Sequence, residues 1–218
     1  MNHGRRSSQL PGTDRAEDAW VGLVTIDGPA GAGKSTAASG VAALMGCAVL
    51  DVGVLYREIS TRVLDRQRDG IGWKQSVLDS LEGPMPATGQ RSEHRSPAVD
   101  EIVATVASQP SVRKVVARWQ RDWWEGHQAA IVVGRVGGLH IFPDADAKVF
   151  LTADEDVRRR RRHDLAVNVG VRDRTDAARA VQPMEHSPDA VVIDTTALGA
   201  DEVIARICRL MRERSHGF

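Results

Sequence analysis

An eight-residue run near the start of the chain has the residue types and the spacing of a phosphate-binding loop. It reads Gly28-Pro-Ala-Gly-Ala-Gly-Lys-Ser35 and fits the pattern G-x-x-x-x-G-K-[ST]. Glycines let the backbone wrap closely around an anion, so that successive N–H groups point at phosphate oxygens. The lysine of such a loop reaches the β- and γ-phosphates, and the hydroxyl after it ligates Mg²⁺. We therefore expect a nucleotide to be bound by Gly28, Gly31, Ala32, Gly33, Lys34, Ser35 and Thr36.

The loop needs a strand before it and a helix after it, and the flanking residues predict both. Residues 20–27 are apolar and include β-branched side chains, which is typical of a buried strand. Residues 35–45 are rich in alanine and other good helix formers. The sequence lacks the N-K-x-D motif of GTPases. The apolar run 129–133 ends in Gly134–Arg135 rather than in the acid that a motor ATPase needs, so the pattern favours a kinase.

Apolar runs and helical patterns alternate along the rest of the chain. Strands are predicted at 20–27, 47–50, 129–133, 147–151 and 191–194. Helices are predicted at 35–45, 55–66, 99–107, 112–124, 155–163 and 201–214, whereas the polar segment 69–97 is assigned no element. This alternation predicts an α/β fold of three layers, with a central parallel sheet covered by helices on both faces. Ligands bind beyond the carboxyl ends of such strands, and Asp27, Asp51, Gly134 and Leu151 fall there.

Length and composition limit the class of protein. The chain has 218 residues, of which 42% are hydrophobic, enough for one domain at 20–218 after a flexible leader at 1–19. The 29 basic residues balance 29 acidic ones, which argues against a general nucleic-acid binder. No apolar run reaches the roughly 18 residues that a membrane span needs. Cys47 and Cys208 lie in apolar stretches without metal-ligand spacing, which is typical of reduced, buried thiols in a cytoplasmic protein.

Several arginines stand at the ends of predicted elements. Phosphoryl transfer brings two anions together, so its site needs cations that offset their repulsion. Residues 158–162 are consecutive arginines, and a solvated helix face is the simpler interpretation for two or three of them. The arginines at element ends are Arg57, Arg113, Arg135, Arg172 and Arg179.

Five blocks of the sequence, in a fixed order, carry a family pattern. The first two are T-I-D-G-P-A-G-A-G-K-S-T at 25–36 and D-V-G-V-L-Y-R at 51–57. The third is V-A-S-Q-P-S-V-R at 106–113, followed by W-Q-R at 119–121. The last two are V-G-R-V-G-G-L-H-I-F-P-D-A at 133–145 and R-D-R-T-D-A-A-R-A-V-Q-P at 172–183. Through these blocks the chain resembles the bacterial cytidylate kinases from Val24 to its C-terminus.

The resemblance implies a P-loop kinase with a central sheet, an acceptor-binding flap and a mobile LID that closes over the phosphates. By position, the flap spans about residues 65–110 and the LID about residues 158–180. The resemblance also implies ATP as the phosphoryl donor, Mg²⁺ as a cofactor, and a monomer that binds small nucleotides. The LID is short, because only ten residues separate Arg161 from Arg172.

The resemblance also assigns roles to individual positions. The acceptor phosphate would be held by Arg57, Arg113 and Arg135, and the acceptor sugar and base would face Asp176 and Arg179. Arg158, Arg161 and Arg172 would lie on the LID side, near the donor phosphates. The residues expected to act in catalysis are Lys34, Arg135, Arg161 and Arg172. Ser35 and Asp51 are the candidate metal ligands, with a turn-capping role equally open for Asp51.

Three positions that read the acceptor in the family pattern are apolar in this chain. Val52 replaces the serine of D-S-G, and Val136 replaces the aspartate of G-R-D, both of which contact cytosine. Ala104 replaces a serine on the sugar side. A site built to hydrogen-bond its substrate loses discrimination when those partners are missing. Because the phosphate-holding arginines are all retained, the substitutions indicate a reshaped pocket.

Three hypotheses follow from these residues. The first is a nucleoside monophosphate kinase with a non-standard acceptor, such as a modified pyrimidine nucleotide. The second is an ordinary CMP/dCMP kinase that reads cytosine through Arg179 and backbone groups. The third is a non-catalytic nucleotide-binding protein, against which the intact Lys34 and Ser35 argue.

Overall fold

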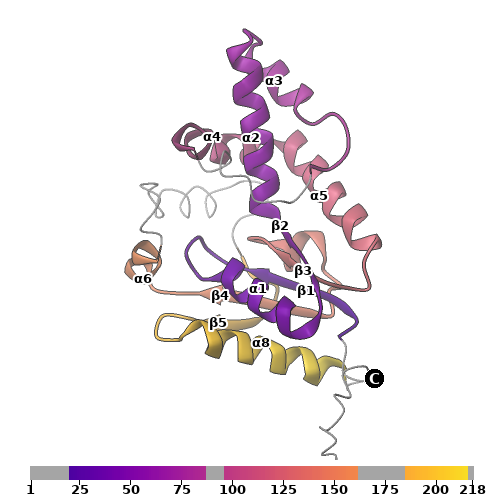
Figure 1. Cartoon of the computed structure of the whole chain (residues 1–218), viewed down its shortest axis with the longest axis vertical. Helices are drawn as coiled ribbons and strands as arrows, with labels where there is room; N and C mark the ends of the chain where they lie inside the picture. Colours follow the sequence, from indigo (N-terminus) through magenta and orange to yellow (C-terminus); the bar gives the residue numbers. More distant parts are fainter. Residues whose placement is uncertain (1–19, 87–95, 162–184, 216–218) are drawn as a thin grey trace, which may run out of the picture.

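Five parallel strands form the sheet at the centre of the molecule (Figure 1). The computed structural model describes residues 20–86, 96–161 and 185–215. The strands lie side by side in the order β2-β3-β1-β4-β5, so that β1 is the middle strand. Their bounds are Gly22–Asp27 for β1, Ala48–Asp51 for β2, Ala129–Val133 for β3, Ala147–Thr152 for β4 and Val191–Asp194 for β5.

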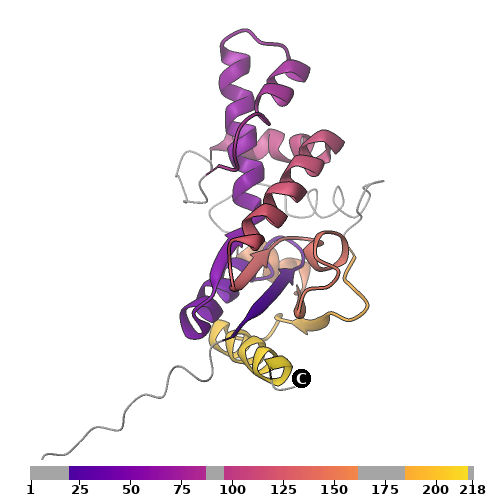
Figure 2. The same cartoon turned by 90° about the vertical axis from the view of Figure 1, so that its right-hand side faces the viewer.

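Helices cover both faces of the sheet and give the fold its three layers (Figures 1 and 2). One apolar core packs α1 and α8 against one face, and a second packs α2, α4 and α5 against the other. The helices are α1 (Lys34–Met45), α2 (Val52–Arg68), α4 (Pro97–Ser108), α5 (Pro110–Glu125) and α8 (Ala200–Ser215). Because every residue of β1 is buried, its sequence is a continuous apolar run rather than an alternating one.

Three of the described helices begin where the sequence supplies a capping side chain. The Asp51 carboxylate accepts from the N–H of Gly53 and caps α2, which therefore starts three residues before the prediction. Ser96 caps α4, and Pro97 occupies its first turn, where no backbone donor is lost. Asp154 caps α6 (Glu155–Arg160) by accepting from the N–H groups of residues 156 and 157.

Two elements in the described part of the chain were absent from the prediction. Helix α3 (Trp73–Asp79) lies inside 69–97, a segment to which the sequence analysis assigned no structure. It is only seven residues long and starts at Gly72, so it carries too little periodicity to stand out from the polar residues around it. The second is η2 (Gly137–Ile141), a π-helical turn after β3. The predicted strands, the other helices and the three-layer α/β fold are confirmed.

The two cysteines are free thiols on the α1–α8 side of the sheet. Cys208 is buried in the core, and Cys47 is half-buried against it. Burial raises the pKa of Cys47 to about 11, so this thiol stays protonated and unreactive at neutral pH. Within the described residues, no helix is both long and apolar enough to cross a membrane.

Candidate active site

The phosphate-binding loop joins the end of β1 to the start of α1, at the carboxyl edge of the sheet. Gly28 and Gly31 have φ angles of 134° and 81°, which L side chains rarely adopt. A Cβ on Gly28 would lie 2.0 Å from the carbonyl oxygen of Leu151, and one on Gly31 would lie 2.6 Å from that of Arg158. The motif glycines are therefore required both by the turn of the loop and by its close packing on β4 and α6.

Lys34 is the first residue of α1, where backbone N–H groups and a charged amine are presented together. Its Nζ donates to the carbonyl oxygen of Pro29 at 2.6 Å, which holds the ammonium across the mouth of the loop. Ala32 is buried in the core, whereas Ser35 and Thr36 are exposed on the first turn of the helix. This arrangement concentrates positive charge at the loop, as an anion-binding site requires.

Ser35 and Asp51 place two oxygen ligands side by side. The Ser35 hydroxyl donates to Oδ2 of Asp51 at 2.8 Å, while Oδ1 of the same carboxylate caps α2. Mg²⁺ prefers oxygen ligands and takes only one or two from the protein when phosphates supply others. The donor set therefore fits Mg²⁺. Among the described residues, no cluster of three or more acidic, histidine or cysteine side chains forms an all-protein metal site.

Arg158 and Arg161, the two described arginines that were assigned a role on the LID side, contact the backbone around the loop. Arg158 is 9% exposed. Its Nε donates to the carbonyl of Ala153 at 2.9 Å, and its Nη1 to that of Ala30 at 3.2 Å. Arg161 donates to the hydroxyl and the carbonyl oxygen of Thr195 at 2.8 and 2.6 Å. The Thr195 hydroxyl in turn lies 3.3 Å from the carbonyl of Ala32. Both guanidinium groups thus support the loop from its outer side.

The predicted acceptor arginines come from three elements that meet at the carboxyl edge of the sheet. Arg57 lies in the second turn of α2, and its Nη1 is 3.3 Å from the carbonyl of Gly53. Arg113 lies in the first turn of α5 and is 9% exposed. Arg135 follows β3 directly and is half-buried. Three other predicted site residues lie outside the described residues: Arg172 on the LID side, and Asp176 and Arg179 at the acceptor sugar and base.

The positions that lost their polar side chains are largely buried. Val52 is the first residue of α2, is 6% exposed, and packs in the second core with Leu50 and Leu55. Val136 is 9% exposed and precedes η2. Ala104 lies half-buried on α4. The first two therefore place buried apolar side chains just after the carboxyl ends of β2 and β3.

Asp27 is a buried carboxylate that the sequence analysis placed near a strand end without giving it a role. It is the last residue of β1 and is 5% exposed. Burial raises its pKa, against the opposing effects of the N–H groups of Gly138 and Gly137 and of the Lys34 charge. No local motif could have identified these partners, because they lie about 110 residues away in the sequence.

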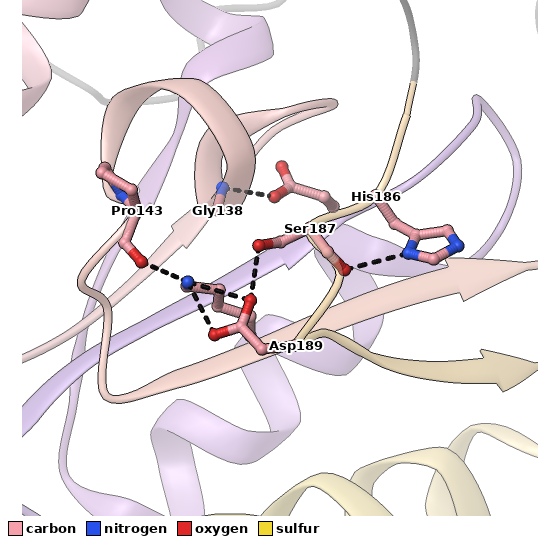
Figure 3. A network of polar contacts seen from close by, with 7 residues as sticks. Gly138, Pro143, His186, Ser187 and Asp189 are labelled. Atoms are coloured by element: carbon pink, nitrogen blue, oxygen red, sulfur yellow. Dashed lines mark hydrogen bonds and ion pairs between the residues drawn. The ribbon is translucent and has the colours of Figure 1, made fainter.

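A second polar network, also missed, ties β4 to the segment before β5 (Figure 3). The buried Lys148 ammonium donates to the carbonyl of Pro143 and, at 2.8 Å, to Asp189. The Ser187 hydroxyl donates to the same carboxylate at 2.5 Å. The Lys148 and Ser187 hydrogen bonds lower the pKa of Asp189 to about 2. This network fixes the turn after η2 and the chain that returns to the sheet.

Comparisons with known proteins identify the relatives of this chain. The family model described as cytidylate kinase matches residues 24–213. A cytidylate kinase of Granulibacter bethesdensis is 36% identical over 210 residues, covering 88% of this chain and 97% of its own. A cytidylate kinase of Mycobacterium leprae is 35% identical over 215 residues, covering 88% of this chain and 96% of its own.

A solved structure shares the fold. The protein TT1252 of Thermus thermophilus superposes with a TM-score of 0.51 at 17% sequence identity, over 91% of this chain and all of its own. At that identity the likeness concerns the α/β fold alone. The family model and the two relatives together show that the chain belongs to the cytidylate kinase family and is a nucleoside monophosphate kinase.

Proposed function

We propose that this enzyme transfers the γ-phosphoryl group of ATP to a pyrimidine nucleoside monophosphate other than plain CMP, forming the diphosphate. The observation that carries the proposal is the pair of buried valines, Val52 and Val136, at two positions where the family pattern has polar cytosine readers. A cytosine amino group placed against two apolar side chains would lose its hydrogen bonds. A base with an apolar substituent at that edge would be accommodated better.

On the donor side, the backbone N–H groups of residues 28–35 would hold the β- and γ-phosphates, with Lys34 between them. Ser35 and Asp51 would hold Mg²⁺, which neutralises charge on the phosphates when bound. Arg158 and Arg161 would keep the loop in shape through its carbonyl groups. Arg172 would complete the donor side from the LID.

On the acceptor side, Arg57, Arg113 and Arg135 would grip the monophosphate and turn one of its oxygens toward the γ-phosphorus. That oxygen is ionised at neutral pH, so the attack needs no general base. Catalysis then rests on positioning and on charge neutralisation. Asp176 and Arg179 would face the sugar and the base. The exclusion of water would depend on the flap at about 65–110 and the LID at about 158–180.

A second candidate, an ordinary CMP/dCMP kinase, is favoured by the 36% identity to a curated cytidylate kinase. Under this alternative the valines would be neutral replacements, and cytosine would be read by Arg179 and backbone groups. We also propose that the enzyme is a cytoplasmic monomer that acts on small nucleotides only. Sedimentation at assay concentrations would test its oligomeric state.

A panel of nucleoside monophosphates, incubated with ATP and Mg²⁺ and read by product mass, tests the proposed acceptor. We expect at least one base-modified pyrimidine nucleotide to have a higher kcat/KM than CMP. Phosphorylation of CMP with the highest efficiency of the panel would establish the second candidate instead. Binding of ATP without turnover of any monophosphate would contradict both.

Restoring the family's polar readers tests the pocket directly. The double variant Val52→Ser/Val136→Asp should raise kcat/KM for CMP about tenfold or more, because each regained hydrogen bond favours cytosine. Val136→Ala is the matched control, since it changes the size of the side chain without adding a polar group. It should not raise kcat/KM for CMP. No gain for CMP in the double variant would argue that these positions do not read the base.

A further inference from the structure

Asp27 joins two parts of the site that are far apart in the sequence. Its Oδ1 accepts from the N–H of Gly137 at 2.8 Å, and its Oδ2 from the N–H of Gly138 at 2.7 Å. The second of these contacts is drawn at Gly138 in Figure 3. One carboxylate at the entrance to the phosphate-binding loop therefore holds the first two residues of η2, the turn that follows the acceptor arginine.

The backbone that carries Arg135 and Val136 is fixed to the end of β1 on both sides. On one side, the N–H of Gly134 donates to the carbonyl of Ile26 at 3.1 Å. On the other side, Gly137 is held by the Asp27 carboxylate. A Cβ on Gly134 would lie only 3.1 Å from Oδ1 of Asp27, so the segment wraps closely around this side chain. Only residues 135 and 136 lie between the two anchor points.

A buried carboxylate is not what the packing of a parallel sheet requires at the end of its middle strand. Burial disfavours its charged form, and an apolar residue would fill the same space without that cost. Its two oxygens are both used as acceptors by backbone donors, and the charge of Lys34 acts on it from the donor side. Charged groups kept in such surroundings are often tied to function.

We propose that Asp27 is a positioning residue, which holds the segment 134–138 so that Arg135 meets the acceptor phosphate in line with the donor loop. The proposal rests on the acceptor role proposed for Arg135, and it is independent of which base the acceptor carries. Asp27 itself touches no reacting atom in this scheme. It acts on the reaction through the backbone on either side of Arg135.

The first test is the variant Asp27→Asn, assayed with the best acceptor of the panel. An asparagine side chain has the same shape but offers only one acceptor oxygen, and its NH₂ group would face a backbone N–H. We expect KM for the acceptor to rise about tenfold to a hundredfold, with KM for ATP changed less than about twofold. A rise in KM for ATP alone, or no change in either KM, would overturn the proposal.

A double-mutant cycle asks whether Asp27 acts through Arg135. In the Arg135→Ala background, Asp27→Asn should have little further effect on KM for the acceptor, because the side chain that it positions is gone. Equal and independent effects of the two substitutions would contradict the mechanism. If CMP proves to be the best acceptor, the base preference proposed above is wrong. The cycle is then carried out with CMP and still tests whether Asp27 acts through Arg135.

Loss of stability has to be separated from loss of positioning. Asp189→Asn is the matched control, since it removes a carboxylate from a structural network without touching residues 134–138. It should lower the unfolding temperature while leaving both KM values unchanged. If Asp27→Asn does not fold, amide hydrogen exchange of the wild-type enzyme tests instead whether Asp27 holds residues 137 and 138. The N–H groups of Gly137 and Gly138 should exchange as slowly as those of β1. Rapid exchange would contradict the proposal that Asp27 holds them in place.

Discussion

At the scale of single residues, the cations of this site differ in what they contact. The Lys34 ammonium lies at the mouth of the phosphate-binding loop, held by one carbonyl of that loop. The Arg158 guanidinium is buried and donates to two backbone carbonyls, one of which belongs to the loop, so it stabilises the loop itself. Arg135 stands on a short segment fixed at both ends. In the proposed mechanism, positive charge therefore serves binding at Lys34 and Arg135 and supports the loop at Arg158.

Lys34→Ala should lower kcat by about a hundredfold or more, because a preorganised cation at the transferred phosphoryl group is lost. Steady-state kinetics with saturating ATP and acceptor measure the effect. Lys74→Ala, which removes an exposed lysine on α3, is the control and should keep normal turnover. Near-normal kcat in the Lys34 variant would contradict its assignment to catalysis.

Arg135→Ala should mainly weaken use of the acceptor. Hydrogen bonds to a charged partner contribute about 1.5–3 kcal/mol, so KM for the acceptor should rise about tenfold to a hundredfold while KM for ATP stays within about twofold. Arg209→Ala, on the exposed face of α8, removes an arginine without touching the site. A fall in ATP affinity instead would mean that the donor and acceptor sides have been interchanged.

At the scale of elements, the site is built from the first turns of helices. The loop runs into α1, and the end of β2 runs into α2 through Asp51. The hydrogen bond from Ser35 to Asp51 links the starts of these two helices. Asp51 therefore has a structural role, as the cap of α2, and a position from which it can take part in metal binding.

Two substitutions at Asp51 separate these roles. Asparagine caps helices about as well as aspartate, so Asp51→Asn should keep the stability of the wild type, whereas Asp51→Ala should lose about 1 kcal/mol. Both variants should need more Mg²⁺ for half-maximal turnover, because the carboxylate charge is gone. Thermal unfolding and a Mg²⁺ titration give the two readouts. An unchanged Mg²⁺ requirement in Asp51→Asn would show that Asp51 caps α2 but does not take part in metal binding.

At the scale of the whole molecule, the buried Lys148 ammonium joins segments that are distant in the sequence. Lys148 reaches from β4 to the turn after η2 and to the chain that enters β5 (Figure 3). Its partner Asp189 is 60% exposed, so water screens much of the attraction.

The Lys148–Asp189 contact makes the free energy of unfolding depend on pH in the acid range. The folded-state pKa of Asp189 is about 2, below its ordinary value of 3.8, so its stabilisation is fully present above that value and is lost as the pH falls toward 2. Asp189→Asn should be less stable than the wild type by a constant amount above about pH 5, and the deficit should shrink below about pH 4. Urea unfolding at several pH values measures this, and a deficit that grew in acid would contradict the sign.

Much of the fold was predictable because the relevant signals are local. All five strands of the sheet are short apolar runs, and α1 and α8 follow from helix-forming composition and amphipathic spacing. Helix α3 and the turn η2 were not predicted. The first is too short to show a period, and the second depends on Asp27, about 110 residues earlier in the sequence, holding two of its N–H groups.

The sequence by itself determined the phosphate-binding loop, the order of strands and helices along the chain, and the apolar replacements at Val52 and Val136. Each of these depends on neighbouring residues or on a short motif. Only the tertiary structure decided that Arg158 turns toward the backbone of the loop and that Asp27 holds residues 137 and 138. These contacts join segments distant in sequence, and folding sets them through strand order and packing, which no local pattern specifies.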